Sequence, residues 1–318
     1  GLSGQLTEEY LAPLGAALWS CPTEQVLDFP AETVLGFLDN HFMLQRARPK
    51  WRTTKHRSED YVERLHAALR TAGGSIRTAT EVTRLQADVR GGVFVYDVQG
   101  RLVDPEPFDR VVLAVHADQT LDILRRSELL AGDVEKVEAT LGNFRYFPNE
   151  VCVHTDPQFM PRNRACWGAW NALQLPGAAP VTYWVNKLQP GASTEGQDIF
   201  VTLNAPDGSI KPESLLGRYV LDHPVLDKHA LAAQRGLPGL QGLAGGGRVR
   251  PPAARLVLLV VAAVELGGVA AAAWAHELAY VLVRQRAGRD IATLPRGPTE
   301  VLVEGHGAPW ARQERLLG

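Results

Sequence analysis

Hydrophobic residues recur at helical spacing in the first part of the chain. An apolar stripe over 5–20 predicts one helix, and a second over 31–44 predicts another. Ser58 is a suitable N-cap for a third helix, whose apolar face ends at Gly73-Gly74. The sequence therefore predicts a helical start.

The apolar spacing then changes to that of strands. Two valine-rich segments, 82–89 and 93–98, predict a pair of strands around the Gly91-Gly92 turn. The run Phe108–Val115 is continuously apolar after Arg110, which is typical of a strand buried on both faces. A helix is predicted from about Asp118.

Residues 117–204 are predicted to form an antiparallel sheet with flanking helices. The strand-like runs are Phe144–Val153, Ala165–Asn171, Val181–Leu188 and Ile199–Leu203. We expect the aromatic residues of this meander to line one face of the sheet: Trp167, Trp170, Tyr183 and Trp184.

Composition narrows the function classes. The chain has 318 residues, 45% of them hydrophobic, and a formal net charge of −2. This is a globular composition without the excess of cations that nucleic-acid binding requires, so no nucleic-acid partner is expected. Three scattered cysteines predict neither a disulfide framework nor a metal site. With no signal peptide visible at Gly1, a cytoplasmic location is favoured.

The composition shifts after Gly242. Residues 251–318 contain no Lys, Asn, Ser, Phe, Cys or Met. One interpretation is a reading-frame slip near residue 243, which would make 243–318 an aberrant or disordered tail that proteases remove first. The other is membrane association through 256–283, although Glu265 in the middle of that apolar run is unfavourable in a bilayer.

Common catalytic motifs are absent. The chain has no GxGxxG after a strand, no P-loop and no GxSxG, and His276-Glu277 lacks the second histidine of a zinc protease motif. No metal ligand set is predicted.

Residues 10–242 nevertheless resemble the FAD-dependent amine oxidoreductase superfamily, in its branch of predicted NAD/FAD-binding proteins, distant relatives of monoamine oxidase and phytoene desaturase. The matching sequence segments occur in the family's order and spacing: 14–20 (LGAALWS), 48–53 (RPKWRT), 108–119 (FDRVVLAVHADQ), 153–156 (VHTD) and 183–189 (YWVNKLQ).

The resemblance implies an α/β (α+β) fold in which a partial, Rossmann-like FAD-binding domain joins a substrate domain of helices and antiparallel sheet. It assigns 1–50 to the helical part of the substrate domain, 51–116 to the FAD-binding domain and 117–242 to the substrate domain with its sheet. The family's GxGxxG unit would precede residue 1, and its second FAD motif would follow Gly242. We expect the chain to be a fragment that is incomplete and inactive by itself.

The resemblance also implies site residues. The cofactor is FAD, with Val82 at the adenine ring, Ala114 on the strand leading back to the site, and His56, Arg57 and Ser58 in place of a Gly-Gly-Ser turn near the flavin. Asn149 falls near a lysine that orients a water in amine oxidases. Because asparagine carries no charge, amine oxidation itself is in doubt. The aromatic meander suits a small apolar or lipid-like substrate. The alternative function is a non-catalytic substrate-domain remnant that binds a partner or a lipid, with membrane contact through 256–283.

Overall fold

The protein is described here from a computed structural model. It describes residues 4–46, 57–89, 91–127, 134–173, 175, 179–189 and 196–240, together with strand backbone at 255–258, 280–284 and 300–302; of residues 57–59, too, only the backbone is described. The chain forms a mixed α+β fold with antiparallel sheets, which confirms the predicted fold class.

A helical unit begins the chain. It comprises α1 (Gly4–Leu6), the π-helical turn η1 (Thr7–Leu11), α2 (Ala12–Trp19), α3 (Thr23–Val26) and α4 (Ala31–Asn40). Pro13 lies in the first turn of α2, which directly continues the helical turns of η1, so the proline does not end the helical run. Trp19 holds the unit together through edge contacts with the rings of Phe29 and Phe37, at 5.5 and 5.1 Å between centroids.

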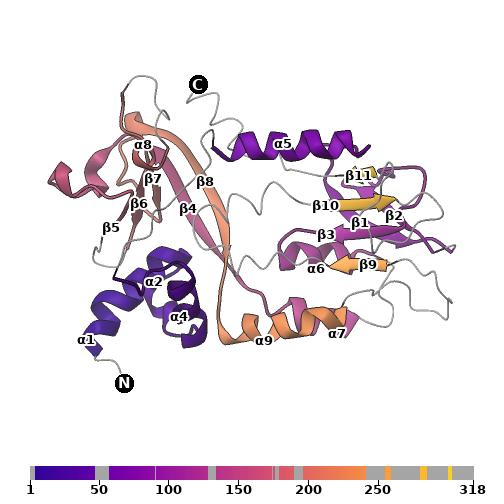
Figure 1. Ribbon diagram of the computed structural model, residues 1–318, viewed down its shortest axis with the longest axis horizontal. Helices are drawn as coiled ribbons and strands as arrows, with labels where there is room; N and C mark the ends of the chain where they lie inside the picture. The colour runs from indigo at the N-terminus through magenta and orange to yellow at the C-terminus, as the bar shows by residue number, and fades with distance from the viewer. Residues whose placement is uncertain are drawn as a thin grey trace.

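The largest sheet is antiparallel throughout and has the order β5-β6-β7-β4-β8. Its strands are β4 (Tyr146–His154), β5 (Trp170–Ala172), β6 (Val181–Trp184), β7 (Phe200–Leu203) and β8 (Leu215–Pro224). One face packs on α2 through Ala17, and Val225 and Leu226 after β8 enter the helical core. Helices α1–α4 and this sheet form what we call the large-sheet lobe, at the left of Figure 1.

The antiparallel sheet predicted for this region is thus confirmed, with two local corrections. Residues 164–166 form a 3₁₀ turn, η4 (Arg164–Cys166), so the predicted strand Ala165–Asn171 shrinks to β5. After β6 the chain turns into α8 (Val185–Leu188), because Asn186 accepts the N–H of Ile199 and bends the chain out of the strand. Short 3₁₀ turns η3 (Pro157–Phe159) and η5 (Pro212–Ser214) complete this part of the chain.

The remaining elements form the small-sheet lobe, at the right of Figure 1. Its members are α5 (Arg57–Thr71), β1 (Val82–Ala87), β2 (Val93–Asp97), β3 (Arg110–Leu113), α6 (Ala117–Arg125), α7 (Val134–Leu141), α9 (Lys228–Gly236) and η6 (Leu237–Leu240). A shared core of strand and helix residues, including Leu85, Val111, Leu124 and Leu141, joins these segments apart from α5. Helices α6 and α7, which the resemblance assigned to the substrate domain, therefore share a core with β1–β3.

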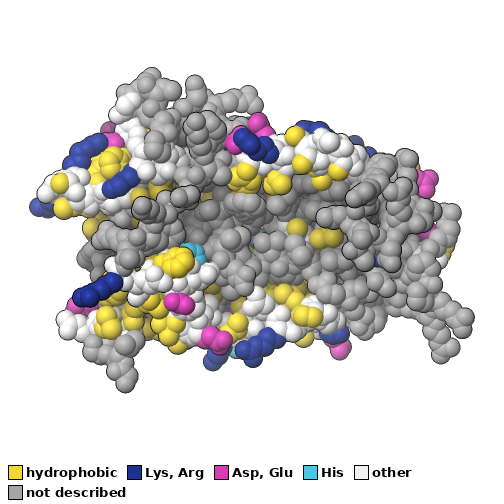
Figure 2. Space-filling model, viewed as in Figure 1, with side chains coloured by type: hydrophobic (Ala, Val, Ile, Leu, Met, Phe, Trp, Pro, Cys, Tyr) yellow, Lys and Arg dark blue, Asp and Glu magenta, His cyan; other side chains and the backbone are white. Residues whose placement is uncertain are grey.

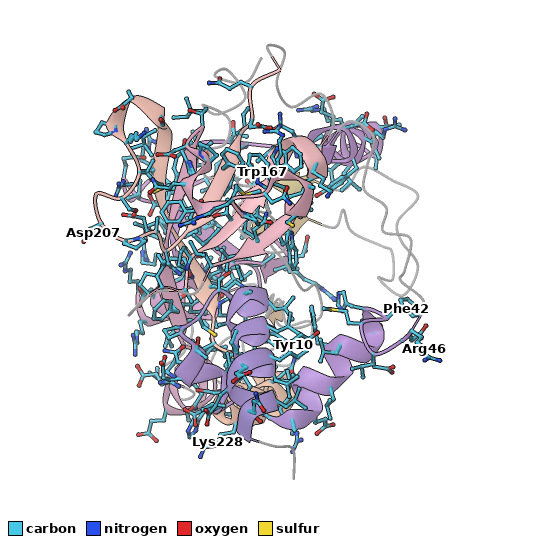
Figure 3. The ribbon with its side chains drawn as sticks, turned by 90° about the vertical axis from the view of Figure 1, so that its left-hand side faces the viewer. Tyr10, Phe42, Arg46, Trp167, Asp207 and Lys228 are labelled. Carbon is cyan, nitrogen blue, oxygen red and sulfur yellow. The ribbon has the colours of Figure 1, made fainter. Side chains whose placement is uncertain are left out.

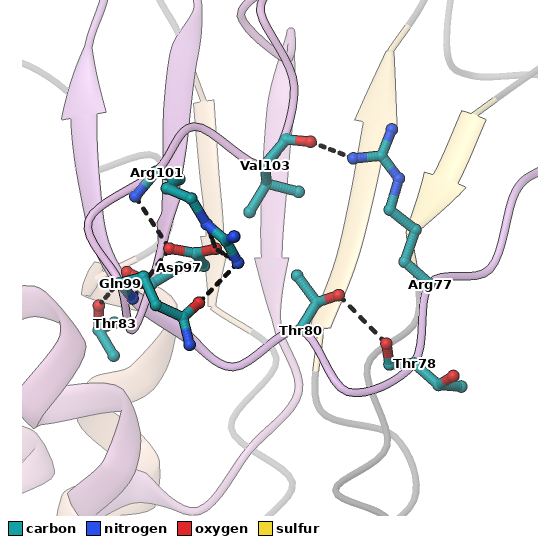
Figure 4. A network of polar contacts seen from close by, with 8 residues as sticks. All are labelled: Arg77, Thr78, Thr80, Thr83, Asp97, Gln99, Arg101 and Val103. Carbon is teal, nitrogen blue, oxygen red and sulfur yellow. Dashed lines mark hydrogen bonds and ion pairs between the residues drawn. The ribbon is translucent and has the colours of Figure 1, made fainter.

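The antiparallel β1–β2 hairpin is confirmed as predicted. Figure 4 shows the polar contacts beyond β2, where Asp97 accepts hydrogen bonds from the backbone N–H groups of Gln99 (2.9 Å) and Arg101 (2.8 Å). The Arg101 side chain also donates to Asp97 at 2.9 Å, and these bonds lower the pKa of the carboxyl against the opposing effect of desolvation. The Arg77 guanidinium donates to the carbonyl of Val103 and fixes the next loop.

Strand β3 lies inside a four-stranded sheet of order β11-β10-β3-β9. It is parallel to β9 (Arg255–Leu258) and antiparallel to β10 (Tyr280–Arg284), which pairs with β11 (Glu300–Leu302). Val111 and Leu113 are fully buried, whereas Arg110 and Val112 are half-buried, so the expectation of a strand buried on both faces is wrong.

Part of the region after Gly242 thus forms strands on β3, whereas 259–279 and most of the rest lie outside the described residues. In the part of the chain that the structure describes, no helix is long and apolar enough to cross a bilayer.

Candidate functional site

Four of the five cofactor residues predicted from the sequence lie in the small-sheet lobe, and the fifth, His56, lies outside the described residues. Val82 opens β1, is buried, and pairs with Asp97. Ala114 directly follows β3 and is also buried. The backbone of Arg57 and Ser58 forms the first turn of α5, so Ser58 lies inside the helix and is not its N-cap.

At the end of β3 and the start of α6, the side chains of His116, Gln119 and Tyr146 lie close together. The ring of His116 stacks on that of Tyr146, with 4.5 Å between centroids and 13° between planes. The Ala117 N–H donates to the Tyr146 hydroxyl at 2.8 Å, and the His116 N–H donates to the Gln119 side chain at 3.2 Å. Tyr146 begins β4, so this corner joins the two lobes.

Burial keeps two ionisable groups of this corner, Tyr146 and His223, uncharged. Burial raises the pKa of Tyr146 well above its usual range, so the phenol stays protonated. Burial also lowers the pKa of His223 on β8, and the nearby His116 lowers it further. His223 therefore favours the neutral ring at pH 7, mainly because burial desolvates it.

A helix that follows a central strand is where a dinucleotide pyrophosphate is normally held, on free backbone N–H groups. At α6 these groups already have partners: Ala117 N–H donates to Tyr146, and Gln119 N–H donates to Asp118 at 2.8 Å. The Asp118 carboxylate would also repel a phosphate. The described residues at α6 therefore do not fit the pyrophosphate of FAD.

Asn149 lies on β4, where its side chain is buried and already has partners. Its Oδ1 accepts a hydrogen bond from Asn204 Nδ2 at 2.7 Å, and its Nδ2 donates to the carbonyl of Phe147 at 3.0 Å. Asn204 ends β7 in the left-handed conformation (φ 54°) and accepts the Glu150 N–H at 3.1 Å. Asn149 thus fixes the turn at Asn204 after β7. This contact does not bring it together with the other predicted cofactor residues, Val82 and Ala114.

A buried polar row crosses the large sheet, which sequence reasoning missed. His154 Nε2 on β4 shares a hydrogen bond with Thr202 Oγ1 on β7 at 2.7 Å, and Thr202 shares one with Thr182 Oγ1 on β6 at 2.8 Å. His154 is fully buried, and its Nδ1 has no hydrogen-bond partner within the described ranges. Burial lowers the pKa of His154 to about 4. The available signal was weak: single polar residues inside otherwise apolar strands.

The aromatic residues of the sheet lie on two faces, so the expectation of a single aromatic face is wrong. Trp167 contacts the rings of Trp184 (5.2 Å) and Phe200 (5.6 Å), whereas Trp170 contacts Tyr183 (5.5 Å). Tyr183 and Trp184 are consecutive on β6, and consecutive strand residues point to opposite faces.

A cation stacks on one of these aromatic groups at the molecular surface. The Arg164 guanidinium lies 4.4 Å from the ring centroid of Trp167 and pairs with both carboxylate oxygens of Asp198, at 2.7 and 3.1 Å. Trp184 Nε1 donates to the same carboxylate at 2.9 Å. Figure 3 shows Trp167 on the side of the large-sheet lobe away from the helical unit. Because Arg164 is already paired, this cluster connects η4 to the end of β6 and to the segment that leads into β7.

Comparison with known proteins gives remote matches only. No family model matches the chain, and no curated protein does. Solved structures that match include a fatty acid isomerase from P. acnes that produces CLA (16% identity, TM-score 0.44) and an oxidoreductase from Methanosarcina mazei (13% identity, TM-score 0.43). The matches cover 75% and 80% of this chain but 59% and 60% of those proteins, so the chain spans less than two thirds of their length.

Within the described residues, no three His, Cys, Asp or Glu side chains are grouped as a metal site would require.

Proposed function

We propose that this chain is the substrate-domain part, with a portion of the cofactor domain, of a flavin-dependent oxidoreductase of the amine oxidase/desaturase type. The observation that carries the proposal is the path of the chain. It starts in helices of the large-sheet lobe, crosses to β1–β3 in the small-sheet lobe and returns through β4 (Figure 1). The resemblance implies the same order of segments.

The proposed substrate, a small apolar or lipid-like molecule, is supported by the composition of the large sheet. Both of its faces carry aromatic and aliphatic side chains, and the polar row within it is uncharged at neutral pH. Most of these side chains are buried, but a bound molecule can reach Trp170, which is 43% exposed. An aromatic contact of this kind suits an apolar or lipid-like molecule more than a charged one.

The described residues lack a phosphate cradle at α6, so the chain by itself is proposed not to retain FAD. A charged pyrophosphate needs charge-assisted hydrogen bonds that Val82 and Ala114 do not offer through apolar side chains.

The test is the flavin absorbance of two purified proteins, followed by release of FAD on denaturation. One is the 318-residue chain, and the other is extended upstream in the genomic reading frame and restored to frame after Gly242. We expect the first to be colourless and the second to be yellow. Stoichiometric FAD on the short chain would contradict the cofactor argument, and a colourless extended protein would contradict the oxidoreductase proposal.

A second candidate is a non-catalytic remnant that binds a lipid or a partner. The exposed apolar side chains of the helical unit favour it, and the same experiment separates the two, because a remnant stays colourless in both forms.

A further inference from the structure

Strand β8 lies at the edge of the large sheet. It pairs with β4 on one side, and no strand that the structure describes pairs with its other side. Such an edge presents backbone N–H and C=O groups that another strand can bind, and lysines, prolines or a short length commonly protect it. β8 has ten residues, no lysine, and a proline only at its last position. An extra residue at Leu216 interrupts the pairing with β4, so we call the regular residues 217–223 the β8 edge.

Three side chains on one face of the β8 edge are exposed. Val220, in the middle, is 67% exposed, and Arg218 and Asp222 lie two residues to either side of it on the same face. Arg218 donates to Glu150 of β4 at 2.7 Å, whereas no cation among the described residues pairs with the Asp222 carboxylate. In Figure 3, Asp207 in the loop after β7 marks the left-hand margin of the molecule, on the side of the sheet that ends in β8.

The charges of the β8 edge are complementary to those of a second copy of the same edge. In an antiparallel pair with a twofold axis, the residue on the axis lies opposite its own copy, and residues at equal distances on either side lie opposite each other. With Val220 on the axis, Arg218 lies opposite Asp222 of the second copy, and Asp222 lies opposite its Arg218. An axis at Arg218 or at Asp222 would instead place like charges opposite each other, which is unfavourable.

The other face of the β8 edge matches its copy in the same register. Tyr219 lies opposite Leu221 of the second copy, and aromatic–aliphatic pairs of this kind stabilise neighbouring strands. The Arg218 guanidinium has five N–H donors, so it can bind Asp222 of the second copy and keep Glu150. Net charge opposes association little, because the formal charge is −2 and Figure 2 shows described cations and anions mixed around the margin of one face.

We propose that two copies of this chain associate through their β8 edges, with Val220 at the twofold axis, and so join their large sheets into one continuous antiparallel sheet. The partner is a second copy because the charges on one face and the apolar pair on the other are both complementary to the same edge in a single register. Association of this kind needs neither flavin nor activity, so it can fail while the oxidoreductase proposal holds.

The first experiment is sedimentation equilibrium of the full 318-residue chain over a range of concentrations. We expect a monomer–dimer equilibrium. Val220→Lys places two ammonium groups opposite each other at the axis, so the dissociation constant should rise about tenfold or more. Val98→Lys changes an exposed valine directly after β2 and should dimerise as the unmodified chain does. A monomer at every concentration, or an unchanged dissociation constant for Val220→Lys, would refute the proposal.

Two charge variants test the register. Arg218→Asp and Asp222→Arg should each lose the homodimer, because like charges would then lie opposite each other. Mixed in equal amounts, the two variants should form a heterodimer, since every carboxylate then lies opposite a guanidinium. If both variants are folded by circular dichroism and the mixture stays monomeric, the proposal is wrong.

A cross-link gives an answer even where Arg218→Asp does not fold. Directly opposite residues of an antiparallel pair have Cα atoms about 4.5–5.5 Å apart, within the range of a disulfide. In a Cys166→Ser background, which removes the exposed thiol, Val220→Cys should form a covalent dimer with oxidised glutathione as the oxidant. Val98→Cys in the same background should remain monomeric. Equal cross-linking of the two variants would count against a specific β8 interface and overturn the proposal.

Discussion

The imidazole of His154 and the hydroxyl of Thr202 are joined by a 2.7 Å hydrogen bond inside the large sheet, between neighbouring strands β4 and β7. The rings of Phe159 and Phe200 both lie near the imidazole, with centroids 6.2 and 5.7 Å away. A histidine in such surroundings is neutral, and protonating it requires a charge to be placed in the core.

This burial predicts a stability that falls in mild acid. The pKa of His154 is lowered to about 4 in the folded chain, whereas an unfolded histidine titrates near pH 6.5. Between those values the unfolded state binds more protons, so the free energy of unfolding decreases as the pH drops below about 6.5 and levels off below about 4. The full loss is on the order of 3 kcal/mol.

Urea unfolding at a series of pH values measures this loss. His154→Gln keeps a polar partner for Thr202 and should make the profile shallower in that window, where the lowered pKa of His223 leaves a part of the loss. His229→Gln, which changes an exposed histidine on α9, should leave the profile unchanged. A profile of His154→Gln as steep as that of the unmodified chain would contradict the prediction.

Asn149 and Asn204 should be coupled in stability. Replacing either by alanine leaves buried polar groups of the other without a partner, at a cost of about 1–3 kcal/mol. A double-mutant cycle of Asn149→Ala and Asn204→Ala, read by urea unfolding, should give a coupling energy of about 0.5 kcal/mol or more. Strict additivity of the two losses would mean that the contact contributes nothing.

The three cysteines should differ sharply in reactivity. Burial raises the pKa of Cys21 to about 12 and that of Cys152 to about 11, whereas Cys166 is exposed. Because the thiolate is the reactive form, an aromatic disulfide reagent at pH 8 should label one thiol quickly in the native chain and all three after unfolding. Cys166→Ser should abolish the fast phase; a remaining fast phase would show that Cys21 or Cys152 is accessible.

Two glycines in neighbouring helices should respond in opposite ways to alanine. At Gly15 in α2 an added Cβ would lie 2.4 Å from Val26 Cγ1, whereas at Gly36 in α4 nothing lies within 4 Å. Gly15→Ala should lower the free energy of unfolding by about 1–3 kcal/mol through overpacking. Gly36→Ala should raise it by about 0.5–1 kcal/mol, because alanine is the better helix former. Thermal unfolding compares the two, and equal effects would contradict the packing of α2 on α3.

The sequence by itself determined the local elements. The helical period of its apolar residues predicted the helices of the first part, because burial of one helix face requires that period. The spaced valines predicted β1 and β2, and the short apolar runs predicted β4, β6 and β7. It could not set Ala165–Cys166, where a 3₁₀ turn replaces a strand, since Asn163 accepts the Ala165 N–H and so competes with strand pairing.

Tertiary structure alone decided which residues meet. His154, Thr182 and Thr202 lie on separate strands, and only the pairing of β6 with β7 and of β7 with β4 makes them neighbours. Tertiary structure also brings Asn149 of β4 to Asn204 after β7, and Tyr146 of β4 to Ala117 at the start of α6. Strand order depends on the free energy of the whole core, in which contacts distant in the sequence compete. The alternating pattern of a strand restricts its register but does not identify its partner strand.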